Sequence, residues 1–224
     1  MFEELDALWR SPTIKPSFEL AHVVLALFMF EENKDGIGRY RLQKELSIGS
    51  GTAKSLIKKL NEDLNFIKVL TDENVIKGHI LTETGLEFVK KIRKKFPLIK
   101  AGDSSVLKDI IIKSKGKISF FCFLRNAIDK MTNGIEQRDA AIKIGAVGAT
   151  CLLYNGKDLI FPSPSLSENN HEQMGVDENV FEYISSFIQN KGYQLKKNDV
   201  IIIGIGDNLE NARLGALNAA LTLI

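Results

Sequence analysis

The chain has 224 residues, of which 44% are hydrophobic and 26% charged, and its formal net charge is +2 at pH 7. This composition is typical of a globular protein and excludes a disordered or fibrous chain, while the length favours two domains. The longest early hydrophobic run, residues 23–30, is much shorter than the roughly 20 residues that cross a bilayer. Acidic residues precede it where a signal peptide would carry positive charge, so we expect a cytoplasmic protein without a membrane partner.

Cysteine and histidine residues do not indicate a metal or redox centre. Cys122 and Cys151 are flanked by hydrophobic residues and lack the spacing of a disulfide framework or a zinc site. The histidines, His22, His79 and His171, are scattered along the sequence. We therefore expect buried structural thiols, no metal ion and no cofactor.

Positive charge is concentrated in one stretch of the first half. Residues 39–95 carry 13 lysines and arginines against 7 acidic residues, whereas residues 102–224 carry 13 against 14. A surface that binds phosphates is expected in such a stretch.

The first elements in chain order are helices. Hydrophobic residues at positions 20, 23, 24, 27 and 28 predict an amphipathic helix over residues 18–31, with Ser17 as its N-cap. After a turn, residues 38–41 predict a short extended segment and residues 42–46 a short helix. A third helix follows over about residues 50–63, because positions 53, 56, 57, 60 and 64 form one hydrophobic stripe.

A hairpin and a fourth helix come next. Residues 66–70 and 78–81 are β-type segments separated by polar residues, which predicts a hairpin, or wing. Thr82 is the expected N-cap of a fourth helix whose inward residues are Leu86, Val89 and Phe96. The order of three helices, a hairpin and a helix is that of a winged helix-turn-helix domain.

Two motifs resemble a known family. The run LQKELSIGSGTAKSLIKKL, residues 42–60, resembles the helix-turn-helix of prokaryotic winged-helix repressors, in which a Gly-Thr pair opens the recognition helix. The sequence LTETG, residues 81–85, is similar to the signature that ends the wing in those proteins. The later runs EQRDAA (136–141), GAVGAT (145–150) and GIGD (204–207) resemble an archaeal family in which a winged helix precedes an α/β domain of unassigned function.

The third helix is the predicted DNA-reading element. The N-terminal end of a recognition helix meets base edges in the major groove, while basic side chains around it contact phosphates. Gly49 and Gly51 would let the backbone approach the DNA strand closely. The DNA-binding residues expected on this basis are Arg39, Arg41, Ser50, Thr52, Lys54, Ser55, Lys58, Lys59 and Lys77. The acidic hairpin tip, Asp72-Glu73, would be repelled by phosphate, which leaves a winged helix used for protein contacts as an alternative.

The second half predicts a mixed domain. Residues 101–105 are the expected linker, followed by strands at 106–112 and 118–124, a helix at 136–144, and a hairpin of strands 149–154 and 158–161 around Asn155-Gly156. A helix at 177–189, a buried strand at 200–205 and a helix at 209–223 complete the order ββαββαβα. This order predicts an α+β fold whose C-terminal part is a two-layer α/β sandwich with helices on one sheet face.

One turn in this half could bind a ligand. The sequence Gly204-Ile205-Gly206-Asp207 lacks the third glycine of a dinucleotide-binding fingerprint, and Asp207 with Glu210 predicts a capping box. No catalytic set of residues can be assigned, so an enzyme is not the leading interpretation. The expected ligand-binding residues are Arg138, Asp139, Asp207 and Asn208.

The sequence therefore predicts a DNA-binding transcriptional regulator with a winged helix-turn-helix domain at 1–100 and a ligand-sensing or dimerisation domain at 105–224. Its expected partners are double-stranded DNA, a second copy in a homodimer, and a small-molecule effector. A metabolic enzyme with an appended winged helix is an alternative. Archaeal riboflavin kinases are built in that way, but their glycine-rich nucleotide motifs are absent from this sequence.

Overall fold

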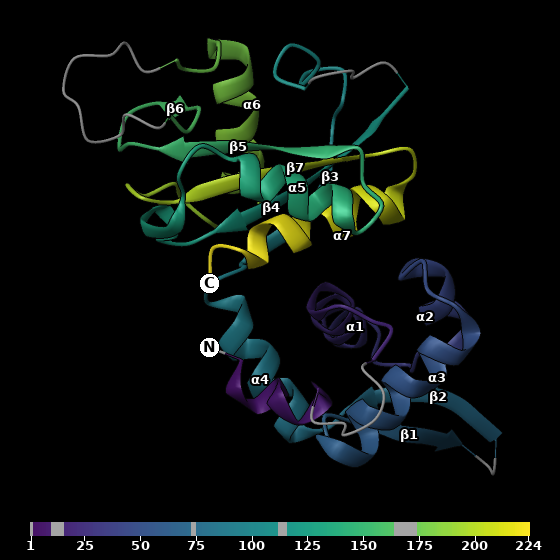
Figure 1. Ribbon diagram of the computed structural model, residues 1–224. Coiled ribbons are helices and arrows are strands. Elements are labelled where there is room, and N and C mark those ends of the chain that lie inside the picture. Colours follow the sequence, from purple (N-terminus) through teal and green to yellow (C-terminus); the bar gives the residue numbers. More distant parts are fainter. Residues whose placement is uncertain (1, 10–15, 73–74, 112–115, 164–173) are drawn as a thin grey trace. The chain divides into compact units, whose positions relative to one another are not determined.

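The computed structural model describes residues 2–9, 16–72, 75–111, 116–163 and 174–224, with the backbone alone at 72 and 75–77. The chain divides into two compact units, Met1–Ile92 and Arg93–Ile224. Both combine helices with antiparallel strands (Figure 1), which confirms the predicted α+β class. Across the described ranges, no helix is long and apolar enough to cross a membrane.

The first unit is built on one buried helix. Every residue from Ala21 to Phe30 of this helix, α1, is buried, which is the pattern of a helix surrounded by its own core. The strand β2 (Val75–Leu81) packs against it. In chain order the unit contains a 3-10 helix (Glu3–Trp9), α1 (Leu20–Glu32), α2 (Arg39–Glu45), α3 (Ser50–Lys58), a π-helical turn (Lys59–Asp63), β1 (Ile67–Asp72), β2 (Val75–Leu81) and α4 (Glu83–Arg93).

Three local predictions in this unit are wrong. The N-cap of α1 is Glu19, whose backbone N–H donates to Nδ1 of His22 at 2.9 Å, and Ser17 lies outside the helix. Residues 39–41 belong to α2 and are not extended, because Gly38 already has the backbone conformation of an N-cap. Leu86 is 38% exposed, whereas Val89 is buried as expected. Phe96 is also buried, but it lies beyond the end of α4 at Arg93 and is not part of that helix.

The hairpin and its connection to α4 follow the prediction. β1 and β2 pair antiparallel, and Ile37 forms a further bridge with His79 on β2. Gly78 has a φ of +123°, and a Cβ there would lie 2.6 Å from the carbonyl carbon of Ile37, so only glycine fits this approach. Thr82 caps α4 by accepting from the N–H of Gly85 at 3.1 Å.

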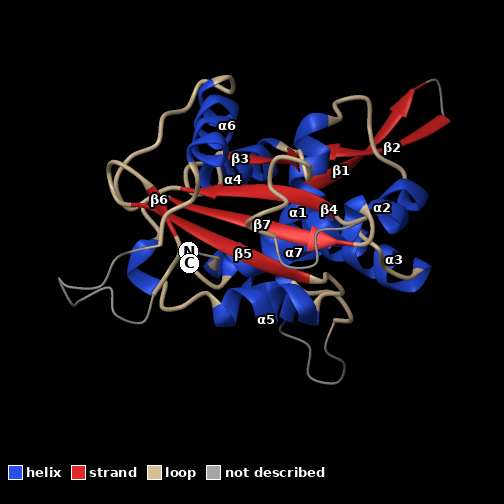
Figure 2. Cartoon of the chain, turned by 90° about the horizontal axis from the view of Figure 1, so that it is seen from above, coloured by secondary structure: helices blue, strands red, loops and turns tan. Residues whose placement is uncertain are grey.

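The second unit contains a five-stranded sheet in the order β3-β4-β7-β5-β6, with every neighbouring pair antiparallel. Seen from above (Figure 2), β4, β7 and β5 run side by side. β7 is in the middle, and each of its residues is buried. The elements are β3 (Leu98–Gly102), β4 (Ile118–Leu124), a 3-10 turn (Ile128–Lys130), α5 (Ile135–Lys143), β5 (Gly148–Tyr154), β6 (Leu159–Ile160), α6 (Glu178–Gln189), β7 (Val200–Gly206) and α7 (Leu209–Leu221).

The predicted order ββαββαβα is present, but its first strand is a different segment. Residues 98–102, expected to include the start of a linker, form the edge strand β3, in which Leu98 pairs with Phe123. Residues 106–111, expected to be a strand, form turns instead, and residue 112 lies outside the described residues. The second unit therefore begins earlier along the chain than the linker at 101–105 implied.

Helices cover both faces of this sheet. α7 packs on β7 and β4, with α5 beside it on β5. Gly204 and Gly206 allow that approach, because a Cβ at Gly204 would lie 2.3 Å from the backbone nitrogen of Ala216. On the opposite face, Ile184 and Ile188 of α6 join a core with alternate residues of β7, including Ile203. The predicted two-layer description is therefore incomplete, because α6 adds a third layer (Figure 1).

Candidate functional site

The helix α3 separates into a buried face and an exposed face as predicted. Ala53 and Leu56 are fully buried, and Leu60 continues the same stripe in the π-helical turn. Lys54 and Lys58 lie on the exposed side. The core stripe thus fixes which side chains of α3 point to solvent.

The N-terminal end of α3 presents a surface with little side-chain bulk. Gly49 is the N-cap and uses only its backbone. Gly49, Ser50 and Gly51 are all exposed, and a Cβ at either glycine would have no other atom within 4 Å. A polynucleotide backbone could approach this end of the helix closely, and the unpaired amides of a helix N-terminus attract phosphate.

The expected DNA-binding cations differ in how far they are engaged within the protein. Arg41 bonds to Glu45 at 2.8 Å and to the Asn33 side chain at 2.7 Å. Lys58 pairs with Glu62 at 3.7 Å and Lys59 with Asp63 at 3.5 Å.

Two of the expected cations have no acidic partner in the part of the chain that the structure describes. Arg39 stacks over the ring of Tyr40, 74% exposed, at 5.1 Å from its centroid. Lys54 forms no ion pair there. The side chain of Lys77 and the hairpin tip, residues 73–74, lie outside the described residues.

Thr52 has an internal partner that the sequence did not indicate. Its Oγ1 lies 2.7 Å from the Oγ of Ser17, in the segment before α1. Ser55 is half-buried in the same helix. Ser17, expected to cap α1, instead contacts the first turn of the predicted recognition helix.

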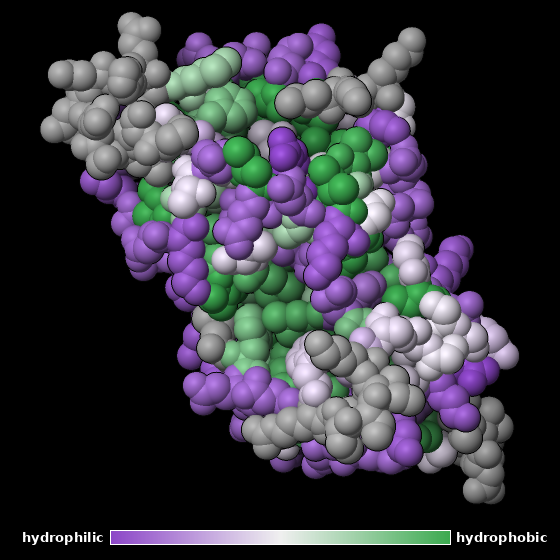
Figure 3. Space-filling view, viewed as in Figure 1, coloured by the Kyte–Doolittle hydropathy of each residue, from purple (hydrophilic) through white to green (hydrophobic). Residues whose placement is uncertain are grey.

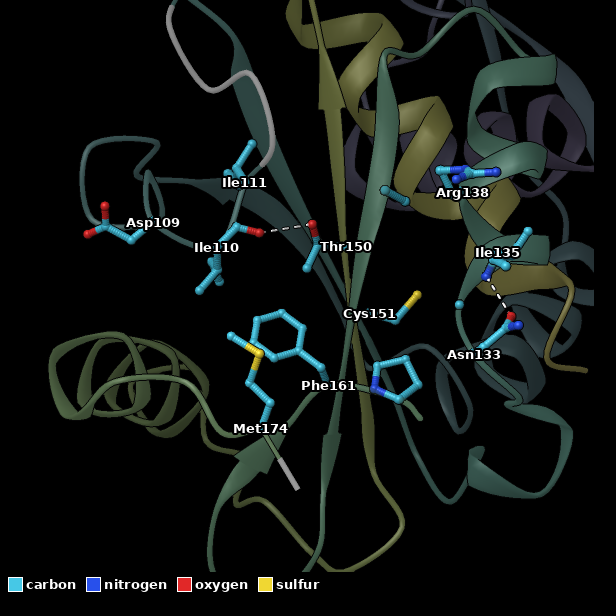
Figure 4. A pocket seen from close by; sticks show the side chains of 13 residues that line it. Asp109, Ile110, Ile111, Asn133, Ile135, Arg138, Thr150, Cys151, Phe161 and Met174 are labelled. Carbon is cyan, nitrogen blue, oxygen red and sulfur yellow. Dashed lines mark hydrogen bonds between the residues drawn. The ribbon is translucent and has the colours of Figure 1, made fainter. Parts of the chain in front are cut away.

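The second unit contains a cavity of about 430 Å³ beside β5 (Figure 4). One wall comes from Ile110, Ile111, Phe161 and Met174, and the other comes from the start of α5. In Figure 4, Thr150 and Cys151 extend from β5 toward opposite walls. The residues from α5 and the loop before it are Asn133, Gly134, Ile135 and Arg138.

The structure does not bring together the four residues expected to bind a ligand. Arg138 lines this cavity, and its Nε and Nη2 donate to Asp139 at 3.0 and 2.8 Å. Asp207 and Asn208 are not among the cavity residues. Asp207 pairs with Lys117, and Asn208 caps α7 by accepting from the N–H of Asn211 at 2.8 Å. The predicted capping box of Asp207 and Glu210 is therefore wrong by one position.

Both thiols are buried, as expected. Burial raises the pKa of Cys151 to about 12, and burial also raises the pKa of Cys122. The thiolate is the nucleophilic form of cysteine, so Cys151 lines the cavity as a small apolar side chain.

Comparison with known proteins adds a family match and a fold. Residues 115–223 match a domain of unknown function, DUF4443. A solved structure, "Hypothetical protein PH0730 from Pyrococcus horikoshii OT3", is similar with a TM-score of 0.66 and 20% sequence identity. The match covers 92% of this chain and 93% of that one, and it shows a shared fold. No curated protein matches the chain.

The DUF4443 match spans β4 to α7 and therefore includes the cavity residues from Asn133 to Met174. Sequence reasoning selected Arg138 from this cavity but missed the edge of β5 and the wall at Ile110. The sequence does not indicate this wall, because residues 106–112 lack the alternation of a half-buried strand. In the structure residues 106–111 form turns, and the backbone carbonyl of Ile110 accepts from Thr150 Oγ1 at 3.1 Å.

Proposed function

We propose that the chain is a DNA-binding transcriptional regulator whose first unit is a winged helix-turn-helix, with α3 as the recognition helix. The element order α1, α2, α3, β1, β2, α4 supports this proposal. The bridge between Ile37 and His79 supports it further. Ile37 lies between α1 and α2, and its pairing with β2 adds a third strand position to the hairpin. In such domains the helix after the turn enters the major groove.

The observation that carries the proposal is the exposed N-terminal end of α3. It combines close backbone access at Gly49 and Gly51 with Lys54, a cation that has no ion pair in the described chain. These groups are the ones that a recognition helix uses, because backbone amides and lysines position the protein on phosphates. A homodimer acting in the cytoplasm on two half-sites, with the second unit responding to an effector, completes the proposed mechanism.

Salt dependence of DNA binding tests the proposal. The affinity of the full chain for a mixed-sequence duplex should fall steeply as salt rises, because bound lysines release counterions from DNA. Lys54→Ala should reduce the log–log slope by about 1. Lys191→Ala, an exposed lysine of the second unit, is the matched control and should leave the slope unchanged. No binding at low salt, or binding that does not depend on salt, would contradict the proposal.

A second candidate function is a winged helix that contacts another protein. The observation that favours it is the pairing of Lys58 with Glu62 and of Lys59 with Asp63, since these acids reduce the positive charge next to α3. The same titration separates the two functions. If replacing Lys58 and Lys59 together leaves DNA binding unchanged while Lys54→Ala also has no effect, the protein-contact function is favoured.

A further inference from the structure

The strand β5 has an open edge over most of its length. It pairs with β7 from Gly148 to Leu153, but β6 pairs with it only at Leu153 and Tyr154. Pro162 follows β6 closely, and proline cannot donate the hydrogen bonds of a ladder. Residues 148–152 therefore have a strand on one side and none on the other among the described residues.

Two hydrogen bonds determine which residues face the open edge. The N–H of Tyr154 donates to the carbonyl of Asp199 on the β7 side at 2.9 Å, and the N–H of Asn155 donates to the carbonyl of Asp158 on the β6 side at 3.2 Å. Backbone groups alternate between the two edges of an antiparallel strand. Ala149 and Cys151 therefore direct their N–H and C=O groups to the open edge, where no described strand or turn hydrogen-bonds to them.

The cavity of about 430 Å³ lies along this edge and has walls of different chemistry. On the α6 side the wall is formed mainly by the hydrophobic residues Ile110, Ile111 and Phe161, and the carboxylate of Asp109 on the same side points away from β5 (Figure 4). On the α5 side Arg138 provides positive charge. Its Nη1 group has no acceptor among the described residues, because Asp139 accepts from Nε and Nη2.

Natural edge strands are usually protected against pairing by charge or proline. Ala149, Thr150 and Cys151 carry neither. An uncharged edge between two walls is a site where an extended polypeptide can add as a strand, since main-chain hydrogen bonds give affinity and alternate side chains give specificity.

The position of α5 argues against a second copy as the occupant. α5 packs beside α7, which lies over β7 and β4. Packed helices are about 8–10 Å apart and neighbouring strands about 4.8 Å apart, so α5 extends past β5 over the position of the next strand. A second β5 placed there around a two-fold axis would bring its own α5 into the same space. A single extended segment carries no helix and avoids this clash.

We propose that the open edge of β5 binds an extended segment of a partner protein as an additional strand. Successive side chains of a strand point to opposite faces. The segment therefore alternates hydrophobic residues, which pack on Ile110 and Phe161, with acidic residues, which pair with Arg138. Ile135 at the start of α5 is 48% exposed and lines the same cavity, so it extends this binding surface. Figure 3 shows hydrophobic patches lying among hydrophilic ones on the second unit.

Peptide binding to the full chain tests the proposal. The probe is a fluorescein-labelled acetyl-Glu-Val-Glu-Val-Glu-Val-amide, with the matched peptide in which Gln replaces each Glu. Fluorescence anisotropy should show saturable binding of the Glu peptide. Ala149→Pro should weaken binding by about 10-fold, comparable to the loss of one backbone hydrogen bond, whereas Ala149→Ser keeps the N–H and should bind normally. Arg138→Ala should weaken the Glu peptide and not the Gln peptide.

Amide hydrogen exchange provides a readout that does not depend on the peptide sequence. The N–H groups of Ala149 and Cys151 should exchange rapidly in the free chain and slowly with the Glu peptide. Absence of saturable binding, or protection of both amides in the dilute free chain, would overturn the proposal. Protection that rises with protein concentration together with a dimeric mass would assign the edge to a second copy, so that result also overturns it.

Different variants test the DNA-binding proposal and the peptide-binding proposal, so the failure of one can be distinguished from the failure of the other. Lys54→Ala should leave peptide binding unchanged, because Lys54 belongs to the first unit. Ala149→Pro should leave DNA binding unchanged, and its melting temperature compared with that of Ala149→Ser shows whether the second unit remains folded.

Discussion

The Oγ of Ser17 and the Oγ1 of Thr52 lie 2.7 Å apart, so the segment before α1 is hydrogen-bonded to the first turn of α3. A hydroxyl can donate one hydrogen bond and accept two. Thr52 therefore keeps capacity for a base edge while Ser17 limits the directions in which its hydroxyl can turn. This contact makes Ser17 part of the proposed DNA-reading surface.

Thr52→Ala and Ser17→Ala should both change sequence preference, by different amounts. On a duplex selected from a random pool, Thr52→Ala should cost about 1–3 kcal/mol and relax the preference at one or two base pairs. Ser17→Ala keeps the hydroxyl of Thr52 but frees its orientation, so it should relax the same positions with a smaller loss. Competition binding measures both. A loss that is equal on all sequences would mean that Thr52 does not face a base.

Gly51→Ala should change the stability of the first unit and its affinity for DNA in opposite directions. A Cβ at Gly51 meets no other atom within 4 Å, and alanine in a helix is more favourable than glycine by about 1 kcal/mol. The first unit should become more stable, while affinity for DNA falls because the methyl group occupies the surface that the DNA backbone approaches. Fluorescence of Trp9, the single tryptophan of the chain, reports unfolding of this unit. Unchanged DNA affinity would show that the N-terminal end of α3 is not the docking surface.

The stability of the second unit should depend on Asn208, which caps α7, and very little on the neighbouring Asp207. Asn208→Ala removes the side chain that accepts from Asn211 and should cost about 1 kcal/mol of stability, the usual effect of losing an N-cap. Asp207→Asn breaks the pair with Lys117, in which the Asp207 side chain is 64% exposed, and should cost less than about 1 kcal/mol. Urea unfolding followed by circular dichroism compares the two variants. A larger cost for Asp207→Asn would restore Asp207 as the important residue of this turn.

The first unit should lose stability in mild acid. Burial lowers the pKa of His22 below its ordinary value of 6.5, and burial lowers that of His79 as well. Below pH 6.5 the unfolded chain binds protons that the folded unit does not, so stability is complete above this pH and declines as the pH falls toward the folded pKa. His22→Gln keeps an acceptor at the third position of α1 and should make the decline shallower. Unfolding followed by Trp9 fluorescence between pH 5 and 8 measures the free energy of unfolding at each pH. If His22→Gln leaves the decline unchanged, groups other than His22 cause it.

The sequence predicted α3 and its exposed face because local periodicity determines both. Ala53, Leu56 and Leu60 are spaced at helical intervals and are buried, so Lys54 and Lys58 face solvent. The hairpin and the cap at Thr82 were predicted for the same reason, since β-type residues and a capping threonine act within a few positions of each other.

The sequence did not predict β3 or the cavity because distant residues decide them. The segment at 98–102 becomes a strand by pairing with residues 119–123 of β4, whereas the more hydrophobic residues 106–111 have no strand to pair with in the described chain and form turns. The same limit applied to Thr52, whose partner Ser17 is 35 positions away, and to Asp207, whose partner Lys117 is 90 positions away. Neither of these two contacts produces a periodic pattern in the amino-acid sequence.

The central position of β7 determines when the second unit can fold during synthesis. β4 and β5 are made earlier than β7, yet they pair with β7 and not with each other. At about 5–20 residues per second, a ribosome needs a few seconds to pass from Tyr154 to Val200, and during that interval hydrophobic strands remain without their central partner. The first unit can complete its folding before then, whereas the second cannot, because its sheet lacks the strand that joins β4 to β5 until β7 has been made.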